Sequence, residues 1–462
     1  MKKSASVILV TALTAASAMA NIFETNETQR ANLKVAETCF KTNALTADGK
    51  PDAAKEWRRG LLVSKTDKTV TILAEACDIL VGATVEFPLV GELSDRDYES
   101  AFRTFARPGE IAAALEGLGV PRGVNVNSAK MQFWAKGERI RVEVSPYGEE
   151  KYRPIEDYLV DKTTGKAPAW NGFVYCGSPD DPESKNGVRL ADAVAPNSVI
   201  STYNEPQTVL DVPVLSNQSD VYERYVLAKD APFKPFALYT IRLSPENRQE
   251  GVPRVRDMKL AFAEEKGKVI GILREGDLGR GFEIPQLFEK MEKRTADGFD
   301  PHVQVSFDEK LTVRQAVALA HLLAKGETDG NLRIGPPPAG TFYYKGFMPN
   351  ESWREAKTRI SQPWEAHFTT NAASFRLVQT IEDWSDKNSI DAKLITKEYT
   401  VATPEEAVKT ITDGDAPLAP NLRLPVILVF APENAPLSTF MPAVRALLPK
   451  HPLVYVFAEK AK

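Results

Sequence analysis

Cysteine and histidine are scarce in this chain of 462 residues, which contains three cysteines and four histidines. The histidines are scattered, with none at the spacing of metal ligands, so the sequence predicts no metal site and no cofactor. None falls between residues 60 and 245, which excludes a Ser-His-Asp triad contained there. The chain also lacks a P-loop and a Cys-x-x-Cys pair. Its glycine cluster at 276–281, GDLGRG, has the wrong order for a phosphate-binding turn.

No charge of one sign dominates. Lysine and arginine number 58 against 62 aspartates and glutamates, and the charges are spread without long runs. This composition argues against nucleic acid or anionic lipid as a partner.

Long hydrophobic runs are absent after the first twenty residues. Lys2 and Lys3 precede the short apolar run SVILVTALTAA, and Ala18-Met19-Ala20 is typical of a cleavage site. The run is shorter than the ~20 apolar residues of a membrane span. We therefore expect a signal peptide over residues 1–20 cleaved after Ala20, a periplasmic or secreted mature chain, and no stable membrane insertion.

An odd number of cysteines in an oxidising compartment leaves at least one thiol free. Cys39 and Cys77 flank the start of the first domain and are the candidate disulfide. Three reduced, buried thiols are the alternative.

The pattern of strands and helices predicts an α+β protein. After a linker segment over 21–56, residues 57–250 are expected to form a mixed domain of strands and long loops. Within it, Ile111, Ala114, Leu115 and Leu118 make one apolar stripe of a helix that begins at Pro108 and ends near Gly119.

Two small α/β modules with strand–helix–strand repeats are expected over 251–345 and 346–462. In the first, Thr312 and Gln315 predict a capping box, and Gly326 is expected to end the helix. The second has a helix predicted to begin at Ser438, 126 residues after Thr312 (438 − 312), which is consistent with a diverged duplication. Between the modules, five aromatic residues form either a buried seam or an exposed stacking surface: Tyr343, Tyr344, Phe347, Trp353 and Trp364.

The stretch SDRDYES contains the strongest candidates for chemistry. Asp95, Asp97 and Glu99 alternate, so a strand here would place them on one face, with Arg96 and Arg103 as counter-charges. Asp97 and Glu99 are the candidate acid–base residues. The alternative is an acidic turn that only fastens a strand.

The candidate binding residues are Ser100, Ser178, Thr202, Tyr203 and Asn204. Polar residues end strands at Thr202-Tyr203-Asn204 and at Gly177-Ser178, and these two groups are expected to line the same pocket. Local turn chemistry is the competing explanation, because Asn and Ser satisfy backbone groups in turns.

Four separated motifs between residues 60 and 245 resemble the YdjY-type domain of bacterial envelope proteins. They are EFPLVGELSDRDYESAF, PGEIAAALEGLGV, WNGFVYCGS and SVISTYNEPQTVLDVP. The family has no established reaction. Its acidic turn commonly reads His-Glu-Ser, whereas this chain has Tyr98-Glu99-Ser100, so an acid–base pair that needs that imidazole is not expected here.

Both C-terminal modules resemble the periplasmic module of the ExbD and TolR proteins, in a strand hairpin, a helix and then strand–helix–strand. Their N-terminal membrane helix is missing, so energy transduction is not implied. The resemblance implies contacts with envelope partners or with cell-wall polymer.

Together these features predict a non-enzymatic cell-envelope protein that binds or scaffolds, with a partner protein or peptidoglycan as its ligand. The alternative is an enzyme that acts on envelope polymer through the turn from Asp95 to Glu99. The sequence leaves the oligomeric state open.

Overall fold

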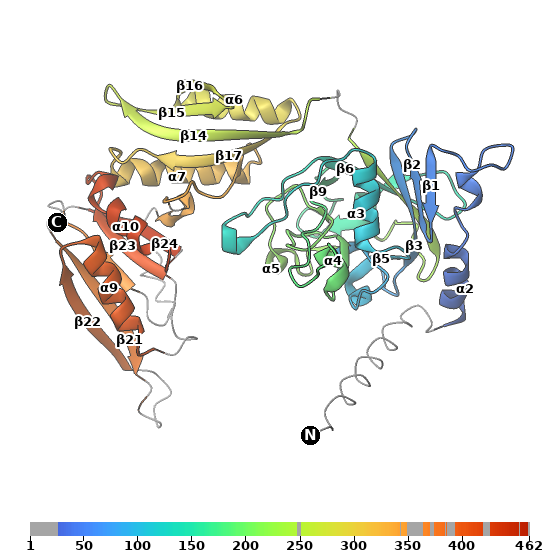
Figure 1. The fold of residues 1–462 in the computed structure, drawn as a ribbon, viewed down its shortest axis with the longest axis horizontal. Helices are drawn as coiled ribbons and strands as arrows, with labels where there is room; N and C mark the ends of the chain where they lie inside the picture. Colours follow the sequence, from blue (N-terminus) through green and yellow to red (C-terminus); the bar gives the residue numbers. More distant parts are fainter. Residues whose placement is uncertain are drawn as a thin grey trace. The chain divides into compact units, whose positions relative to one another are not determined.

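The computed structural model describes residues 26–246, 251–341, 343–348, 364–369, 374–383, 385, 393–418, 426–451 and 453–460. The chain divides into two compact units, Met1–Val255 and Arg256–Lys462. Both units combine helices with sheets, so the predicted α+β class is confirmed (Figure 1). The predicted signal peptide and Trp353 lie outside the described residues.

The first unit is built mainly of short strands. They are β1 (Lys55–Arg58), β2 (Leu61–Ser64), β3 (Thr69–Ala76), β4 (Phe87–Val90), β5 (Ser100–Thr104), β6 (Arg139–Pro146), β7 (Arg153–Pro154), β8 (Leu159–Asp161), β9 (Phe173–Tyr175), β10 (Ser198–Ile200), β11 (Leu210–Asp211), β12 (Tyr225–Leu227) and β13 (Leu238–Pro245). Its helices are α2 (Glu27–Ala36), α3 (Pro108–Gly117), α4 (Leu190–Ala193) and α5 (Gln218–Val221).

The main sheet of this unit closes on itself. Its order is β1-β2-β3-β13-β6-β9-β11-β10-β4-β5, and β5 also pairs with β3. The closure is achieved because β3 shares one edge between two partners: its first half pairs with β2 (Leu61 with Ile72) and its second half with β5 (Phe102 with Ala76). The strands from β3 round to β5 therefore form a barrel, and the β1–β2 hairpin extends outside the ring.

The dipeptide Lys136-Gly137 does not form a hairpin turn. Strand β6 begins after it, at Arg139, and pairs with β13, β9 and β7. A Cβ atom on Gly137 would lie 1.9 Å from the Tyr175 carbonyl oxygen. Gly137 therefore serves a close approach to β9 and does not mark a two-residue turn.

Helix α3 begins at Pro108 as predicted. Ile111, Ala112 and Leu115 are buried against the barrel, and Leu118 packs at its margin. Gly119 follows in the left-handed conformation (φ 86°) that favours glycine at a helix end.

Helix α2 packs on the barrel through a small apolar cluster in which Ala36 and Phe40 meet Leu73 and Phe105. Most of the segment expected as a linker is thus ordered on the barrel surface.

The second unit contains two sheets. The first consists of β14 (Val255–Glu265), β15 (Lys268–Glu275), β16 (Leu278–Glu283), β17 (Asp300–Phe307) and β18 (Arg333–Ile334), with helices α6 (Ile284–Ala296) and α7 (Val313–Thr328). The second consists of β19 (Phe347–Met348), β20 (Trp364–His367), β21 (Phe375–Asp383), β22 (Lys393–Val401), β23 (Val426–Pro432) and β24 (Leu453–Glu459), with helices α9 (Pro404–Asp415) and α10 (Met441–Leu447).

Both sheets follow one plan. The first has the order β16-β15-β14-β17-β18, and the second has the order β22-β21-β20-β23-β24, with β19 added at the end. Numbered along the chain, each is 3-2-1-4-5, with a helix before the fourth strand and another before the fifth. Val426–Phe430 pairs in parallel with Leu453–Phe457, which agrees with the strand–helix–strand repeat predicted for this module. This repeated plan supports the predicted duplication.

The two sheets of the second unit share one hydrophobic core. Tyr344, Phe347 and Trp364 are buried in it, which agrees with the seam and not with an exposed stacking surface. The turn before α7 bonds to the turn after β23: the Leu437 N–H donates to the Leu311 carbonyl (2.8 Å), and the Val313 N–H donates to the Ala435 carbonyl (3.0 Å).

The helix ends were predicted in part. The capping box of Thr312 and Gln315 is present. Helix α7 continues past Gly326 to Thr328, and a Cβ atom on Gly326 would lie 2.8 Å from Leu332, so this glycine makes room for packing. Ser438 lies in a short 3₁₀ turn, and α10 begins at Met441. Among the described residues, no helix is long and apolar enough to cross a membrane.

Candidate functional site

The acidic turn is not a strand. Asp97–Glu99 forms a 3₁₀ turn, closed by the Ser100 hydroxyl, which donates to the Arg96 carbonyl (2.5 Å). The expected alternation on one strand face was therefore wrong. The side chains of Asp95 and Asp97 are 60% and 48% exposed, whereas that of Glu99 is 12% exposed. Only Glu99 of the three faces the protein interior.

Asp97 anchors the turn to the barrel. It lies 3.7 Å from the Arg103 guanidinium, which also lies 3.9 Å from the buried carboxylate of Glu75. Asn32 and Gln29 of α2 donate to the two oxygens of Glu75, at 2.6 and 3.2 Å. Arg103 and Glu75 thus connect Asp97 to helix α2, so Asp97 has a structural role.

Three segments bring carboxylates together at one end of the barrel. β4 and β5 are parallel with Phe87 opposite Ser100, so Glu86 and Glu99 stand side by side just before them. The Glu86 N–H donates to the Glu99 carbonyl (2.9 Å). The segment that follows β10 joins them there, because the Thr202 N–H donates to the Glu86 carbonyl (2.9 Å).

We call Glu86, Glu99, Glu205 and Asp211 the carboxylate cluster. Desolvation and the neighbouring charge of Glu86 raise the pKa of Glu99, while Arg96, with an Nη1 atom 3.5 Å away, opposes the rise. Glu86 is buried and accepts a hydrogen bond from the Gln218 amide (3.0 Å).

Glu205 and Asp211 are the most deeply buried members, at 1% and 0% exposure. Burial raises the pKa of Glu205 to about 7, with a further contribution from the charge of Glu86. Burial also raises the pKa of Asp211 well above its ordinary value. One carboxyl oxygen of each residue, Oε2 of Glu205 and Oδ2 of Asp211, has no hydrogen-bond partner among the residues that the structure describes. A protonated carboxyl is the form that tolerates such a position.

Three predicted binding residues, Thr202, Tyr203 and Asn204, lie next to the carboxylate cluster. The Thr202 hydroxyl donates to the Glu86 carbonyl (3.0 Å), and the Asn204 amide donates to Asp211 (3.2 Å). The Tyr203 ring packs edge-on against Phe87. Burial, together with Glu205, Glu86 and Glu99, raises the pKa of the Tyr203 phenol, so this hydroxyl stays neutral.

Ser178 lies at the other end of β4, contrary to the expectation of a shared pocket. Its hydroxyl accepts from the Ala191 N–H (3.0 Å), and Asn197 links Ala191 to Gly91, just after β4. Ser178 has a left-handed backbone (φ 59°) and is fully buried. Its role in the structure is a local one in the loop.

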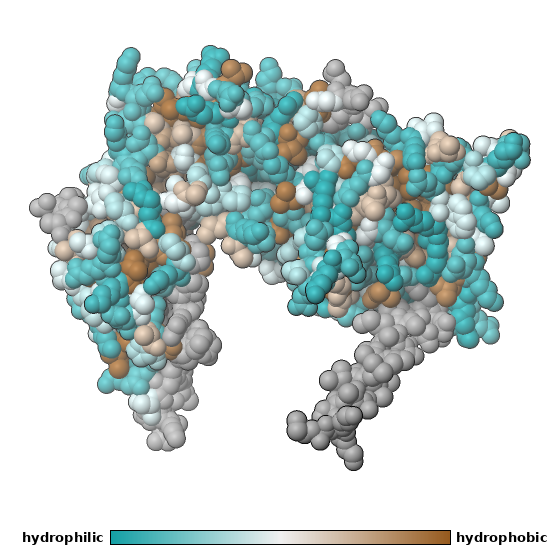
Figure 2. Space-filling view, viewed as in Figure 1, coloured by the Kyte–Doolittle hydropathy of each residue, from teal (hydrophilic) through white to brown (hydrophobic). Residues whose placement is uncertain are grey.

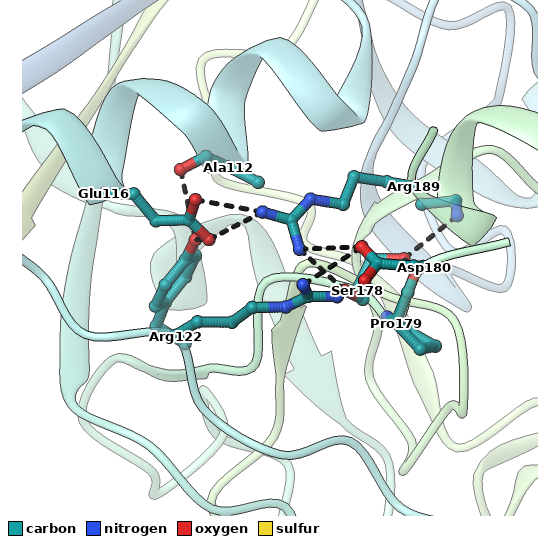
Figure 3. A network of polar contacts seen from close by, with 9 residues as sticks. Ala112, Glu116, Arg122, Ser178, Pro179, Asp180 and Arg189 are labelled. Atoms are coloured by element: carbon teal, nitrogen blue, oxygen red, sulfur yellow. Dashed lines mark hydrogen bonds and ion pairs between the residues drawn. The ribbon is translucent and has the colours of Figure 1, made fainter. Parts of the chain in front are cut away.

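Two arginines converge beside Ser178 (Figure 3). Arg189 grips Glu116 of α3 with two bonds of 2.8 and 2.9 Å, and the Tyr175 hydroxyl donates to the same carboxylate (3.0 Å). Arg122 and Arg189 both reach Asp180, at 3.0 and 3.4 Å. We call this arrangement the arginine clamp; it ties the last turn of α3 to the loop after β9.

Among the described residues, no group of three or more His, Cys, Asp or Glu is placed to hold a metal ion. Cys39, Cys77 and Cys176 are free thiols, so the candidate disulfide is not formed. Burial raises the pKa of Cys39 to about 11, which keeps this thiol unreactive near neutral pH.

Sequence reasoning missed Glu86, Glu205 and Asp211. Each stands within a motif quoted for the resemblance, but Glu86 and Glu205 are beside prolines and apolar residues and carry no spacing signal. What reveals them is the strand pairing, which joins positions more than a hundred residues apart.

The first unit is thus a barrel domain of the α+β class with a buried carboxylate cluster at one end. Residues 61–211 match the family model of the YdjY domain, as the sequence motifs predicted. The match runs from the start of β2 to the end of β11 and contains the whole cluster. Strand β13, which completes the ring, lies beyond it.

No curated protein matches the chain. Among solved structures, a Bacteroides thetaiotaomicron protein described as having an actin-like ATPase fold and unknown function is similar at 8% identity, over 43% of this chain and 90% of that one, with a TM-score of 0.15.

Proposed function

We propose that this protein is exported to the cell envelope and binds a partner protein there, with strand β22 of the second unit as the contact. The N-terminal pattern of residues 1–20 supports export, and the YdjY domain resemblance is to envelope proteins. The ExbD/TolR-like pattern of the C-terminal half belongs to the same proposal, since that module type makes envelope contacts.

The observation that carries the proposal is the exposed edge of the second sheet. β22 lies at the end of the strand order and pairs along nine residues with β21. Leu394 is 64% exposed and Ile395 is 39% exposed. An edge with apolar, β-branched residues is a template for an added strand.

Strand β16, the edge of the first sheet that corresponds to β22, is a poorer template. It has six residues and includes Gly279 and Gly281, which weaken strand pairing. Its exposed Leu278 nevertheless gives a matched control for Leu394. The space-filling view shows hydrophobic residues scattered among hydrophilic ones on the face drawn (Figure 2). A single exposed apolar residue therefore does not indicate a binding surface, whereas apolar residues along a sheet edge do.

The test is site-specific photocrosslinking in intact cells, with the probe placed at Leu394, at Glu398 or at Leu278. We expect a protein adduct from the two β22 positions and none from Leu278. Because a paired strand keeps register, the crosslinked residue of the partner should shift by about four when the probe moves from Leu394 to Glu398. Adducts without that shift, or retention on purified peptidoglycan without any protein adduct, would contradict the proposal.

A second candidate function is favoured by Glu205, since a buried carboxyl with a pKa of about 7 is suited to general acid catalysis. On this alternative the protein cleaves envelope polymer, and Glu99 is the second carboxyl. Release of soluble fragments from purified peptidoglycan should then fall about 100-fold or more in Glu205→Gln and Glu99→Gln. Asp95→Asn, in the exposed part of the same turn, should retain the rate. Equal rates in all variants would remove this alternative.

A further inference from the structure

A small pocket opens between the β1–β2 hairpin and α3, and none of its lining residues belongs to the carboxylate cluster. Its volume is about 280 Å³, the share of roughly nine water molecules at about 30 Å³ each. Cross-strand pairing places Glu56 opposite Val63 and Arg58 opposite Leu61, so one face of the hairpin supplies two charges and an apolar floor.

The opposite wall is one stripe of α3. Glu110, Ala113, Ala114 and Gly117 follow the spacing i, i+3, i+4 and i+7. A Cβ atom on Gly117 would meet no atom within 4 Å. The pocket is therefore open because the helix presents small residues where larger ones would fill the space.

The charges on the two walls are not equally available. Lys65 is paired with Glu56 at 2.6 Å. Arg58 makes no hydrogen bond or ion pair with any residue that the structure describes. On the helix wall, Glu110 uses Oε2 to accept from the Arg107 N–H (3.0 Å), and its Oε1 makes no hydrogen bond or ion pair with a described residue.

We propose that this pocket binds a short peptide with small side chains and both ends free, its carboxylate on Arg58 and its ammonium on Glu110. A guanidinium matches a carboxylate in two parallel bonds. Leu61 and Val63 form the apolar floor beneath the side chains. The volume of about 280 Å³ accommodates a dipeptide with small side chains.

Isothermal titration of the full chain with dialanine tests the assignment. Dialanine should bind with a Kd in the millimolar range or tighter, and both its acetylated and its amidated forms should bind about tenfold more weakly. The L,L and D,D forms distinguish a protein-derived peptide from a cell-wall stem peptide as the source. Absence of binding by dialanine up to about 10 mM, or equal binding of the blocked forms, would overturn the proposal.

Variants separate pocket binding from adventitious binding elsewhere. Arg58→Gln should weaken dialanine about tenfold, and Gly117→Leu should abolish binding by filling the pocket, without a lower melting temperature. Lys34→Leu adds the same side chain to an exposed position of α2 and should bind as the natural protein does. Undiminished binding in Gly117→Leu would place the ligand elsewhere and refute the assignment.

Discussion

At the scale of single residues, the burial of Glu205 makes the free energy of unfolding depend on pH. Its pKa is about 7 in the folded protein against an ordinary 4.5, so between these values the folded state holds more protons than the unfolded state. The natural protein therefore loses stability as pH rises through this window, by about 3 kcal/mol. Below pH 4.5 both states are protonated and the penalty is absent.

Glu205→Gln removes this titration. Compared with the natural protein, the variant should gain about 3 kcal/mol of unfolding free energy between pH 4 and pH 8. Urea unfolding of the first unit at the two pH values measures the gain. A constant difference between the two proteins would show that Glu205 titrates normally.

The arginine clamp allows a second comparison of residues. In Arg189→Met, Tyr175 is the one remaining described residue that bonds to the Glu116 carboxylate. We expect a loss of about 2 kcal/mol of unfolding free energy, as for hydrogen bonds to charged groups. Arg122→Met has the same change in charge, but the Arg122 side chain is 33% exposed against 14% for Arg189. Its loss should stay below about 1 kcal/mol. Denaturant unfolding of both variants measures the two losses. Equal losses would contradict the inference that Arg189 is the main residue that holds α3 to the loop after β9.

Site residues were predictable only where their neighbours in sequence gave a signal. Asp97 and Glu99 were found because charges alternate there, and Thr202 and Asn204 because they end a strand. Their burial and their partners were not predictable, since Glu86 and Thr202 meet through strand pairing across more than a hundred residues. The carboxyl chemistry follows from that meeting and from the exclusion of water.

At the scale of elements, two glycines in helices should respond oppositely to the same change. A Cβ atom on Gly414 of α9 would lie 2.6 Å from the ring of Trp364, which is buried, whereas one on Gly117 of α3 meets nothing. Gly414→Ala should cost about 1–3 kcal/mol through overpacking. Gly117→Ala should gain up to about 1 kcal/mol from helix propensity. Thermal unfolding of each variant measures both effects, and a stabilised Gly414→Ala would contradict the packing argument.

Elements with strong local signals were predicted well. The capping box at Thr312 and the start of α3 at Pro108 both depend on patterns within a few residues of the helix end. The acidic turn was mispredicted because alternation of charge mimics a strand, while the Ser100 hydroxyl closes a 3₁₀ turn instead. Gly326 was mispredicted because a glycine required for packing looks the same as one that ends a helix.

At the scale of the whole molecule, the division at Val255 predicts two unfolding events. Each unit has its own core, so differential scanning calorimetry of the full chain should resolve two transitions. Glu205→Gln should move only one of them with pH, and Gly414→Ala should lower only the other. A single transition that responds to both variants would show that the units unfold together.

Closure of the barrel could not be predicted from the sequence, because it depends on one edge of β3 pairing with both β2 and β5. No local pattern marks a strand with three partners. The match to the YdjY domain, confirmed over residues 61–211, identifies most of this ring without the strand that completes it.

The bonded turns of the second unit have a consequence for how its two halves fold. The Leu311 carbonyl accepts from Leu437, and the Val313 N–H donates to Ala435, while both sheets contribute to one hydrophobic core. A half that is cut from the other would expose its share of that core to water. Neither half should therefore remain folded alone.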